Sequence, residues 1–340
     1  MLANACRDDQ KGAAIKRFGV NPLAMSDVLF IKTSSLGDVI HQMPAMTELR
    51  RNRPATRISW VVENAYAPLV RLNAAVDAVI AVDSRRWRHG LHRAATWREA
   101  KGFLSGLRAR AYDEIIDTQG LFRTALIAKL ARGRRHGYDA QSIREPPASF
   151  FYDVRYGVDR GLHAIARNRL LSALALGHAL DGILDFGLDR KALAGAGGAP
   201  YAVLLHATAR PEKEWGEASW IEAGRRLGAR GIELVLPYGN KIEQQRAARI
   251  AAALPQARVP ERAPLDAVAR LIAGASFVIG VDTGLLHLAA ALGVPLVGIF
   301  VGSEPGLTGP KGVGPIAIVG GKGKMPSVGE VLAALAEISG

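Results

Sequence analysis

Short apolar runs alternate with helical patterns along this chain, and the alternation occurs twice. Such runs are typical of strands buried on both faces of a parallel sheet and joined by crossover helices. Because 340 residues exceed the size at which one hydrophobic core keeps growing, we expect an α/β protein with two Rossmann-like, doubly wound parallel-sheet domains. The predicted strands cover residues 28–32, 58–62, 78–82, 114–117, 201–205, 232–236, 276–281 and 295–300. The predicted helices cover residues 44–51, 97–110, 121–131, 218–229, 242–253, 264–273, 284–292 and about 327–338.

A stretch rich in glycine and alanine separates the two halves. Residues 187–200 lack the side chains that build a core, so we place a linker there. The predicted organisation is an extension at 1–25, an N-terminal domain at 26–186, a C-terminal domain at 201–325 and a final helix at 326–340. Ligands of open α/β sheets bind beyond the carboxyl ends of the strands. Two such domains therefore predict a cleft in which two ligands meet, as group transfer requires.

Cysteine content and charge narrow the class of protein. The single cysteine, Cys6, excludes an intrachain disulfide and a cysteine-built zinc site. Residues 284–302 form the longest apolar stretch, but a histidine, a glycine and a proline interrupt it, which predicts helix, turn and strand instead of a membrane span. Residues 1–24 lack the apolar core of a signal peptide, so we expect a cytoplasmic protein. The net charge of +13 favours an anionic partner such as a phosphorylated substrate, a membrane surface or a nucleic acid.

The most informative local feature is the turn after the first predicted strand. Residues 28–31 are continuously apolar, and the chain then passes through small hydroxyl-bearing residues to Asp38, the only acid of the turn. Hydroxyls and closely approachable backbone N–H groups suit ligand binding there. Asp38 is either a site carboxylate or a first-turn acid that stabilises the next helix, and spacing alone does not separate these roles. The other turn residues are Thr33, Ser34, Ser35 and Gly37.

Three turns in the second half place polar side chains at the same kind of strand end. The predicted helix that begins at residue 284 can direct free N–H groups at an anion such as a diphosphate. Alternatively, Asp282 or Thr283 simply caps that helix, and His287 is a core histidine. Lys213 can neutralise a leaving phosphate or be a solvated loop charge. Glu243, at another helix start, can accept both hydroxyls of a ribose or complement the helix dipole.

A dense basic cluster follows the third predicted strand. Arg85, Arg86 and Arg88 can hold carboxylates or phosphates in bidentate fashion, and Arg144 can add to the same patch. The patch predicts an acidic acceptor; the competing interpretation is a nucleic-acid surface, but aromatic residues make up only 6% and do not alternate with basic ones. The chain has no P-loop, no dinucleotide-binding glycine motif and no His-Glu-x-x-His sequence, which disfavours Walker-type phosphoryl transfer, redox chemistry and zinc hydrolysis.

Taken in order along the chain, these residues resemble lipopolysaccharide heptosyltransferase I, a family of two-domain GT-B glycosyltransferases. The resemblance runs from about Ser26 to the C-terminus, and the Lys-Thr-Ser-Ser stretch of the first turn favours this family over heptosyltransferase II. The matching motifs are Lys32-Thr-Ser-Ser-Leu-Gly-Asp38, Arg85-Arg-Trp-Arg88, Asp117-Thr-Gln-Gly120, His136-Gly-Tyr-Asp139, Arg144-Glu-Pro146, the Lys213 loop and Val281-Asp-Thr-Gly-Leu-Leu-His287.

The resemblance implies an inverting transfer of heptose from ADP-L-glycero-β-D-manno-heptose to the 3-deoxy-manno-octulosonic acid (Kdo) of Kdo2-lipid A in lipopolysaccharide inner-core biosynthesis. It implies Asp38 as the general base, with Lys213 and the helix start at Asp282 stabilising the departing ADP, so that no metal or other cofactor is required. It also implies a cytoplasmic enzyme at the inner face of the inner membrane, with no nucleic acid and no obligate protein partner.

The resemblance also assigns residues to each substrate. The donor-side matches are Thr208, Lys213, Glu243, Asp282, Thr283, Gly284 and His287. The acceptor-side residues are Arg85, Arg86, Arg88 and Arg144, together with Ser34, Ser35 and Gly37 of the first turn. Ala209 and Ala263 depart from the family pattern in regions expected to contact phosphate and adenine.

Two other classes of function remain open from the sequence. One is another GT-B sugar-nucleotide enzyme, such as heptosyltransferase II or a 2-epimerase, which product analysis with a Kdo-bearing acceptor separates. The other is a basic protein that binds nucleic acid or an anionic surface through a degenerate site. Salt-dependent DNA binding without turnover of ADP-heptose indicates that second class.

Overall fold

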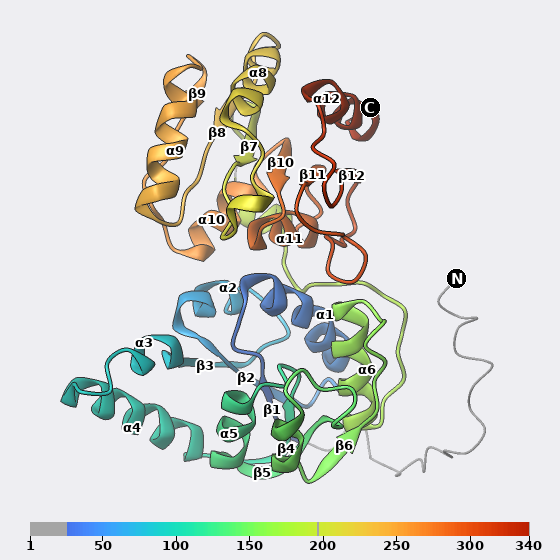
Figure 1. Ribbon diagram of the computed structural model, residues 1–340. Helices are drawn as coiled ribbons and strands as arrows, with labels where there is room; N and C mark the ends of the chain where they lie inside the picture. Colours follow the sequence, from blue (N-terminus) through green and yellow to red (C-terminus); the bar gives the residue numbers. More distant parts are fainter. Residues whose placement is uncertain (1–25, 196, 340) are drawn as a thin grey trace.

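Two six-stranded sheets, one from each half of the chain, form the framework of the molecule (Figure 1). The computed structural model describes residues 26–195 and 197–339, so the predicted extension at 1–25 lies outside the described residues. Every neighbouring pair of strands in both sheets is parallel. The predicted α/β class with two doubly wound parallel sheets is therefore confirmed.

The first sheet takes its strands from residues 27–156. The strands are β1 (Asp27–Ile31), β2 (Arg57–Glu63), β3 (Ala78–Val82), β4 (Ala111–Asp117), β5 (Arg132–Tyr138) and β6 (Val154–Tyr156). Their spatial order is β3-β2-β1-β4-β5-β6, which places β1 and β4 side by side at the centre. The four apolar residues of β1 are buried, as expected for a strand covered on both faces.

Helices cover both faces of the first sheet. They are α1 (Leu36–Asn52), η1 (Asn64–Tyr66), α2 (Ala67–Val70), α3 (Ser84–Arg88), α4 (Ala94–Arg108), α5 (Phe122–Leu130), η2 (Pro146–Phe151) and α6 (Ala164–Leu176). α4 and α5 pack on one face around Leu107 and Ile127, whereas α1, α2 and α6 lie on the other face. A buried ion pair holds α1 to α6, because the Glu48 carboxylate accepts two hydrogen bonds from the Arg169 guanidinium.

The second sheet repeats the strand order of the first. Its strands are β7 (Tyr201–Leu205), β8 (Glu233–Val235), β9 (Ala257–Arg258), β10 (Phe277–Val281), β11 (Leu296–Phe300) and β12 (Ile316–Gly320). Their spatial order, read from β9, is β9-β8-β7-β10-β11-β12. Numbered from its own first strand, each sheet therefore reads 3-2-1-4-5-6. β7 and β10 occupy the places that β1 and β4 occupy in the first sheet.

The helices of the second sheet also lie in two layers. They are η3 (Pro211–Lys213), α8 (Glu217–Gly228), α9 (Lys241–Ala252), α10 (Leu265–Ala273), α11 (Gly284–Ala291) and α12 (Val328–Ile338). α10 and α11 face the first unit, where α11 contacts α1 and α10 contacts α2. One hydrophobic cluster continues across this junction, from Ile40 of α1 to Leu286 of α11. The two units are thus joined through their helices, with the second unit above the first in Figure 1.

Two connecting segments are more ordered than the sequence indicates. The predicted linker at 187–200 contains a short helix, α7 (Arg190–Ala194), which packs on α10. Its Arg190 guanidinium donates hydrogen bonds to three backbone carbonyls, those of Ala273, Ala275 and Gly293. The final helix, α12, packs on β11, β12 and α8, so it belongs with the second sheet. No helix in the described part of the chain has the length and apolar character needed to cross a membrane.

Candidate active site

The site forms where the central strands of each sheet end. In the first unit, the turns after β1 and β4 diverge and leave a crevice; in the second unit, the turns after β7 and β10 do the same. Crevices at such switch points are where doubly wound sheets bind ligands. A cavity of about 1010 Å³ joins the two crevices. Its lining includes Ser35, Gly37, Asp38, His41, Tyr66 and Arg85 from the first unit, and Thr208, Lys213, Glu243, Asp282, Thr283, Gly284 and His287 from the second.

Asp38 has both of the properties that the sequence left open. It is the third residue of α1, and its Oδ2 accepts hydrogen bonds from the Ser35 N–H at 2.8 Å and the Ser35 hydroxyl at 3.2 Å. These contacts make it a helix-capping acid. The half-buried carboxylate also lines the cavity, and among the described residues no hydrogen bond reaches its Oδ1. Asp38 therefore presents one fixed oxygen to the helix and one free oxygen to the cavity.

Two glycines allow the helices that carry the site to touch. A side-chain carbon on Gly284, at the start of α11, would lie 2.7 Å from Cβ of Leu36 in α1. A carbon on Gly37 would lie 3.0 Å from the His287 ring. Any larger residue at Gly284 would force the two helices apart, because distances below 3.0 Å are not tolerated between such atoms. The starts of α1 and α11 thus meet face to face, Asp38 on one and His287 on the other.

The start of α11 differs from the start of α1. Its N-cap is Thr283, whose side chain makes no capping hydrogen bond, and its first turn contains no acid. Free N–H groups and the positive end of the helix dipole therefore face the cavity without a carboxylate of the same helix to neutralise them. This arrangement suits a diphosphate.

Lys213 and Asp282 form an ion pair beside that helix start. The Lys213 Nζ lies 2.5 Å from Asp282 Oδ2, and the Ser303 hydroxyl also donates to this oxygen. Burial alone raises the pKa of Asp282, but the hydrogen bonds from Lys213 and Ser303 outweigh it and the net pKa is lowered. The carboxylate stays ionised and orients the lysine, whose remaining N–H groups are available to the cavity. The Thr208 hydroxyl is not free, because it donates to the Asp282 carbonyl at 2.9 Å.

Three histidines meet at the junction of the two units. His41 Nε2 of α1 lies 3.3 Å from His287 Nδ1 of α11, and the His163 ring packs edge-on against His41. Burial lowers the pKa of His287 to about 4 and the pKa of His41 well below its usual value. His287 is therefore neutral at physiological pH.

A smaller, mostly apolar pocket continues from the cavity into the second unit. Its volume is about 260 Å³, and Ala209, Ala263, Tyr238 and Glu243 are among its lining residues. The Glu243 carboxylate accepts hydrogen bonds from the Gly239 N–H and the Asn240 amide, both at 2.7 Å. Glu243 thus holds its own loop and lines both hollows, and the two alanines that depart from the family pattern lie together here.

A cationic pocket opens on the first-unit side of Asp38. Its volume is about 170 Å³, and Asp38 and Thr308 line both it and the large cavity. Three cations line it: Lys32, Arg144 and Arg167. Burial lowers the pKa of Lys32, although Asp38 and Asp117 act in the opposite direction. Among the described residues none of the three cations forms an ion pair, so we interpret the pocket as a site for an anion.

The structure separates the predicted acceptor residues. Arg85 lines the large cavity and Arg144 the cationic pocket, but Arg86 is bound to Asp83 and Glu99 beside a separate surface hollow, and exposed Arg88 does not line the cavity. In the structure the four arginines therefore do not line one hollow, and their role in acceptor binding stays a prediction. Successive positions on a helix point about 100° apart, so Arg85 and Arg86 leave α3 in different directions.

Ser34 is another predicted acceptor residue that the structure does not bring to the cavity. It is 3% exposed, and its hydroxyl accepts a hydrogen bond from Arg123. Two family motifs have structural roles as well. The buried Asp117 carboxylate accepts the N–H groups of Gln119 and Gly120, which shapes the turn after β4, and buried His136 is held by Glu114 and Tyr156.

Sequence reasoning also missed residues at the site. Lys32 is part of a quoted motif but was assigned no role, Arg167 lies on α6 (a helix that was not predicted), and Thr308 comes from a loop of the second unit. Across residues 26–195 and 197–339, no group of three or more His, Cys, Asp or Glu side chains is arranged to hold a metal ion. The prediction that no metal is required stays a prediction.

Comparison with known proteins identifies the relatives of this chain. A family model described as glycosyltransferase family 9 (heptosyltransferase) matches residues 102–334. Lipopolysaccharide heptosyltransferase 1 of Pseudomonas aeruginosa is 44% identical over 84% of this chain and 81% of the relative, and that of Escherichia coli K12 is 41% identical over 83% and 90%. The solved structure of the E. coli heptosyltransferase WaaC with ADP superposes with a TM-score of 0.86 at 37% identity, covering 92% of this chain and 99% of that one.

Fold and site together define a glycosyltransferase of the GT-B architecture, as predicted. The chain belongs to glycosyltransferase family 9, the heptosyltransferases. The prediction of an enzyme of lipopolysaccharide inner-core heptose transfer is confirmed at this level. The E. coli heptosyltransferase II structure also superposes over 92% of the chain, with a TM-score of 0.73, but at 21% identity, below the 41–44% of the heptosyltransferase 1 relatives.

Proposed function

We propose that this enzyme transfers L-glycero-D-manno-heptose from ADP-heptose to the Kdo of Kdo2-lipid A. One observation carries the proposal: the free oxygen of Asp38 and the anion-binding start of α11 line the same cavity, one from each unit. An enzyme that joins an anionic donor to an acceptor hydroxyl needs these two features on opposite sides of the reacting carbon. Solved structures of the E. coli relative contain ADP and an ADP-2-deoxy-2-fluoro heptose, which supports the donor.

The donor fits the second unit. The adenosine part would occupy the 260 Å³ pocket, where the Glu243 carboxylate is placed to accept ribose hydroxyls. The diphosphate would lie at the start of α11, within reach of Lys213. Because Lys213 is already held by Asp282, it contributes a cation in a fixed position and needs little reorganisation as charge develops.

The acceptor fits the first unit. Kdo is a carboxylic acid, and the cationic pocket of Lys32, Arg144 and Arg167 offers a partner for a carboxylate next to Asp38. Arg85, at the rim of the large cavity, would meet further negative charge such as a lipid A phosphate. The enzyme would act from the cytoplasm at the inner face of the inner membrane, where this lipid-linked acceptor is accessible.

The reaction would be a single displacement. Asp38 Oδ1 takes the proton of the acceptor hydroxyl, whose oxygen forms a bond to the anomeric carbon as the bond from that carbon to the diphosphate oxygen breaks. The bonding electrons leave with ADP, and Lys213, the α11 N–H groups and the neutral His287 ring stabilise the charge. Attack from the side of Asp38 inverts the anomeric centre. These side chains and N–H groups supply the charge stabilisation, so we expect activity without a metal.

Mass analysis of the product tests the proposal. Incubation of purified protein with ADP-heptose and Kdo2-lipid A should add one heptose to the acceptor, and lipid A without Kdo should remain unmodified. Activity should persist in a metal chelator. Release of free heptose without an acceptor product, or equal transfer to lipid A without Kdo, would contradict the proposal.

A further inference from the structure

An apolar stripe lies on the outer face of α5. Phe122, Leu126 and Leu130 are 50%, 43% and 36% exposed, and their spacing of four residues places them on one side of the helix. The opposite side of α5 is also apolar and packs on the first sheet through Ile127 and Ala128. A helix that packs its inner face on a sheet normally carries polar residues outside, so this α5 stripe is unusual for a surface in contact with water.

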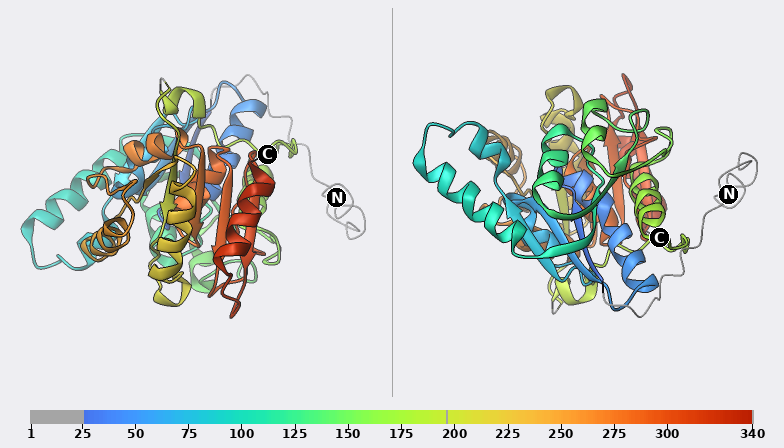
Figure 2. Two further views of the ribbon diagram at one scale, coloured as in Figure 1. Left: turned by 90° about the horizontal axis from the view of Figure 1, so that it is seen from above. Right: turned by 90° about the horizontal axis from the view of Figure 1, so that it is seen from below.

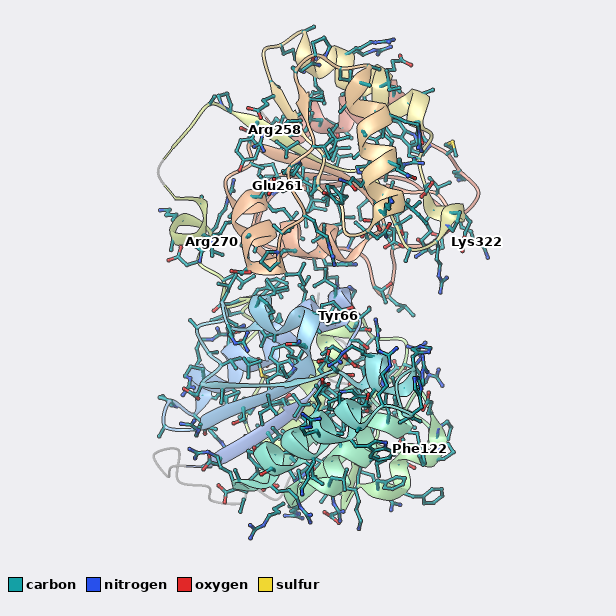
Figure 3. The ribbon with its side chains drawn as sticks, turned by 90° about the vertical axis from the view of Figure 1, so that its left-hand side faces the viewer. Tyr66, Phe122, Arg258, Glu261, Arg270 and Lys322 are labelled. Atoms are coloured by element: carbon teal, nitrogen blue, oxygen red, sulfur yellow. The ribbon has the colours of Figure 1, made fainter. Side chains whose placement is uncertain are left out.

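Other exposed aromatic residues lie on the elements that pack beside α5. Phe150 of η2, the segment packed against α5, is 75% exposed. Trp97 of α4, which covers the same face of the sheet, is 62% exposed. In Figure 3, Phe122 lies at the margin of the first unit, away from Tyr66 at the junction. Both views of Figure 2 show α4, in teal, reaching the edge of the molecule.

The same surface is basic. Lys129 lies next to the α5 stripe, Arg132 follows it, and Arg98 and Lys101 are exposed on α4. These four cations form no ion pairs within the described residues, whereas the nearby Glu99 is bound to Arg86. The surface therefore combines large apolar side chains with unneutralised positive charge. That combination is typical of proteins that lie on an anionic bilayer.

One end of the α5 stripe is linked to residues next to the cationic pocket. The Phe122 N–H donates to the Glu145 carboxylate at 2.7 Å, and Glu145 follows Arg144 of the pocket. Arg123 of the same helix donates to Ser34 in the turn that leads to Asp38. From Phe122 the α5 stripe extends about 12 Å along the helix, given a rise of about 1.5 Å per residue.

We propose that the α5 stripe and its basic surround dock on an anionic phospholipid bilayer and deliver a membrane-held acceptor to the cationic pocket. A second copy of this chain is a poor occupant, because each copy carries a net charge of +13. Nucleic acid does not account for three exposed aliphatic or aromatic side chains along one helix face. The delivery step rests on the proposed function, whereas the docking itself can be measured without substrate.

Vesicle binding tests the docking directly. The probe is vesicles of phosphatidylcholine with or without phosphatidylglycerol, and the variant combines Phe122→Ser, Leu126→Ser and Leu130→Ser. We expect it to bind anionic vesicles at least about tenfold more weakly than the wild type, because the apolar area available for insertion is removed. Ile242→Ser is the matched control, since Ile242 is 79% exposed on α9 of the second unit. It should bind like the wild type.

Two further measurements keep the proposal open to refutation. Lys129→Glu with Arg132→Glu leaves the stripe intact and should abolish the preference for phosphatidylglycerol. Transfer to a water-soluble Kdo acceptor without acyl chains should be unchanged in the triple variant, while transfer to Kdo2-lipid A in vesicles falls at least about tenfold. Wild-type vesicle binding by both variants, a stripe-dependent dimer, or equal loss on both acceptors would overturn the proposal. If the wild type binds vesicles through the stripe but transfers no heptose, the docking stands and the proposed function fails.

Discussion

The two sheets have the same strand order, yet their central crevices carry different charge. In the first unit the helix after the central strand begins with its own acid, Asp38, and the neighbouring cations Lys32 and Arg144 have no carboxylate partner within the described residues. In the second unit α11 begins without an acid, and Lys213 is already paired with Asp282. The same scaffold thus yields one crevice with a base and an open anion pocket, and another with an open helix start and a fixed cation.

This difference supports the proposed placement of the donor in the second unit and of the acceptor in the first. A helix start neutralised by its own carboxylate repels a diphosphate, whereas an unneutralised one attracts it. The assignment of donor to the second unit and acceptor to the first therefore depends on one feature, the presence or absence of a first-turn acid.

The largest expected effect on turnover comes from removing the first-turn acid of α1, Asp38. Asp38→Ala should lower kcat by about 10²–10⁴-fold, the range for loss of a general base, while ADP affinity changes little. Glu330→Ala is the matched control, because Glu330 caps α12 through the Ser327 N–H and hydroxyl, just as Asp38 caps α1 through Ser35. Both variants should lose about 1 kcal/mol of stability. Single-turnover rates measure the loss of catalysis, and titration calorimetry with ADP measures donor-side affinity. Near-normal turnover in Asp38→Ala would contradict the role of Asp38 as the base.

Replacing Lys213, the cation held by Asp282, should have a somewhat smaller effect on turnover. Lys213→Met takes away charge stabilisation of the departing diphosphate and leaves Asp282 without its main partner. We expect kcat to fall by about 10²–10³-fold, as for loss of one preorganised donor. The measurement is steady-state kinetics at saturating acceptor. A change in acceptor KM alone would place Lys213 on the wrong substrate.

His287 should make stability depend on pH. Its pKa is about 4 in the folded chain and about 6.5 when unfolded, so the unfolded state binds the proton first and stability falls as pH drops below 6.5 towards 4. Between pH 7 and pH 5 the loss attributable to this ring is about 2 kcal/mol. Urea unfolding of wild type and His287→Gln at both pH values measures it. Equal pH dependence in the two proteins would contradict the pKa assigned to His287.

The smallest expected effect is on the acceptor KM and concerns the cationic pocket. Arg144→Ala should raise the acceptor KM by about 10–100-fold, corresponding to loss of one charge-assisted contact of about 1.5–3 kcal/mol, with little change in donor KM. Arg88→Ala should change either KM by less than about threefold, since an exposed surface charge contributes about 1 kcal/mol or less. If Arg88→Ala matches Arg144→Ala, the acceptor binds over α3 and not in the cationic pocket.

The sequence predicted most interior strands and the edge strand β3, but it missed β5, β6, β9 and β12. β1, β7, β10 and β11 carry apolar runs because both of their faces are covered, and β4 is apolar and buried at Ile115 and Ile116. β5, with the sequence Arg-Gly-Arg-Arg-His-Gly-Tyr, and β6 lie at one edge of the first sheet, and β9 has two residues. Partly exposed strands need no apolar pattern, so their sequences resemble loops.

Site residues were predictable where they directly follow a predicted strand. They were not predictable where segments that are distant in sequence come together in the fold. All seven predicted donor residues line the large cavity, because each follows a strand end in the second unit. On the acceptor side, Arg86 is paired with Glu99, and neither Arg86 nor Arg88 lines the large cavity, although both lie close to Arg85 in sequence. Arg167 could not be found, because it reaches the pocket from α6, whose position depends on the buried pair of Glu48 and Arg169.

The contact between Gly284 and Leu36 has a mechanical consequence. It lies between α1 and α11, the two helices that carry the proposed reacting groups, at the junction of the units. Rotation about a fulcrum displaces nearby atoms least and distant atoms most. A rotation of one unit about this contact would therefore widen the outer rim of the cavity far more than it would change the spacing between Asp38 and the start of α11.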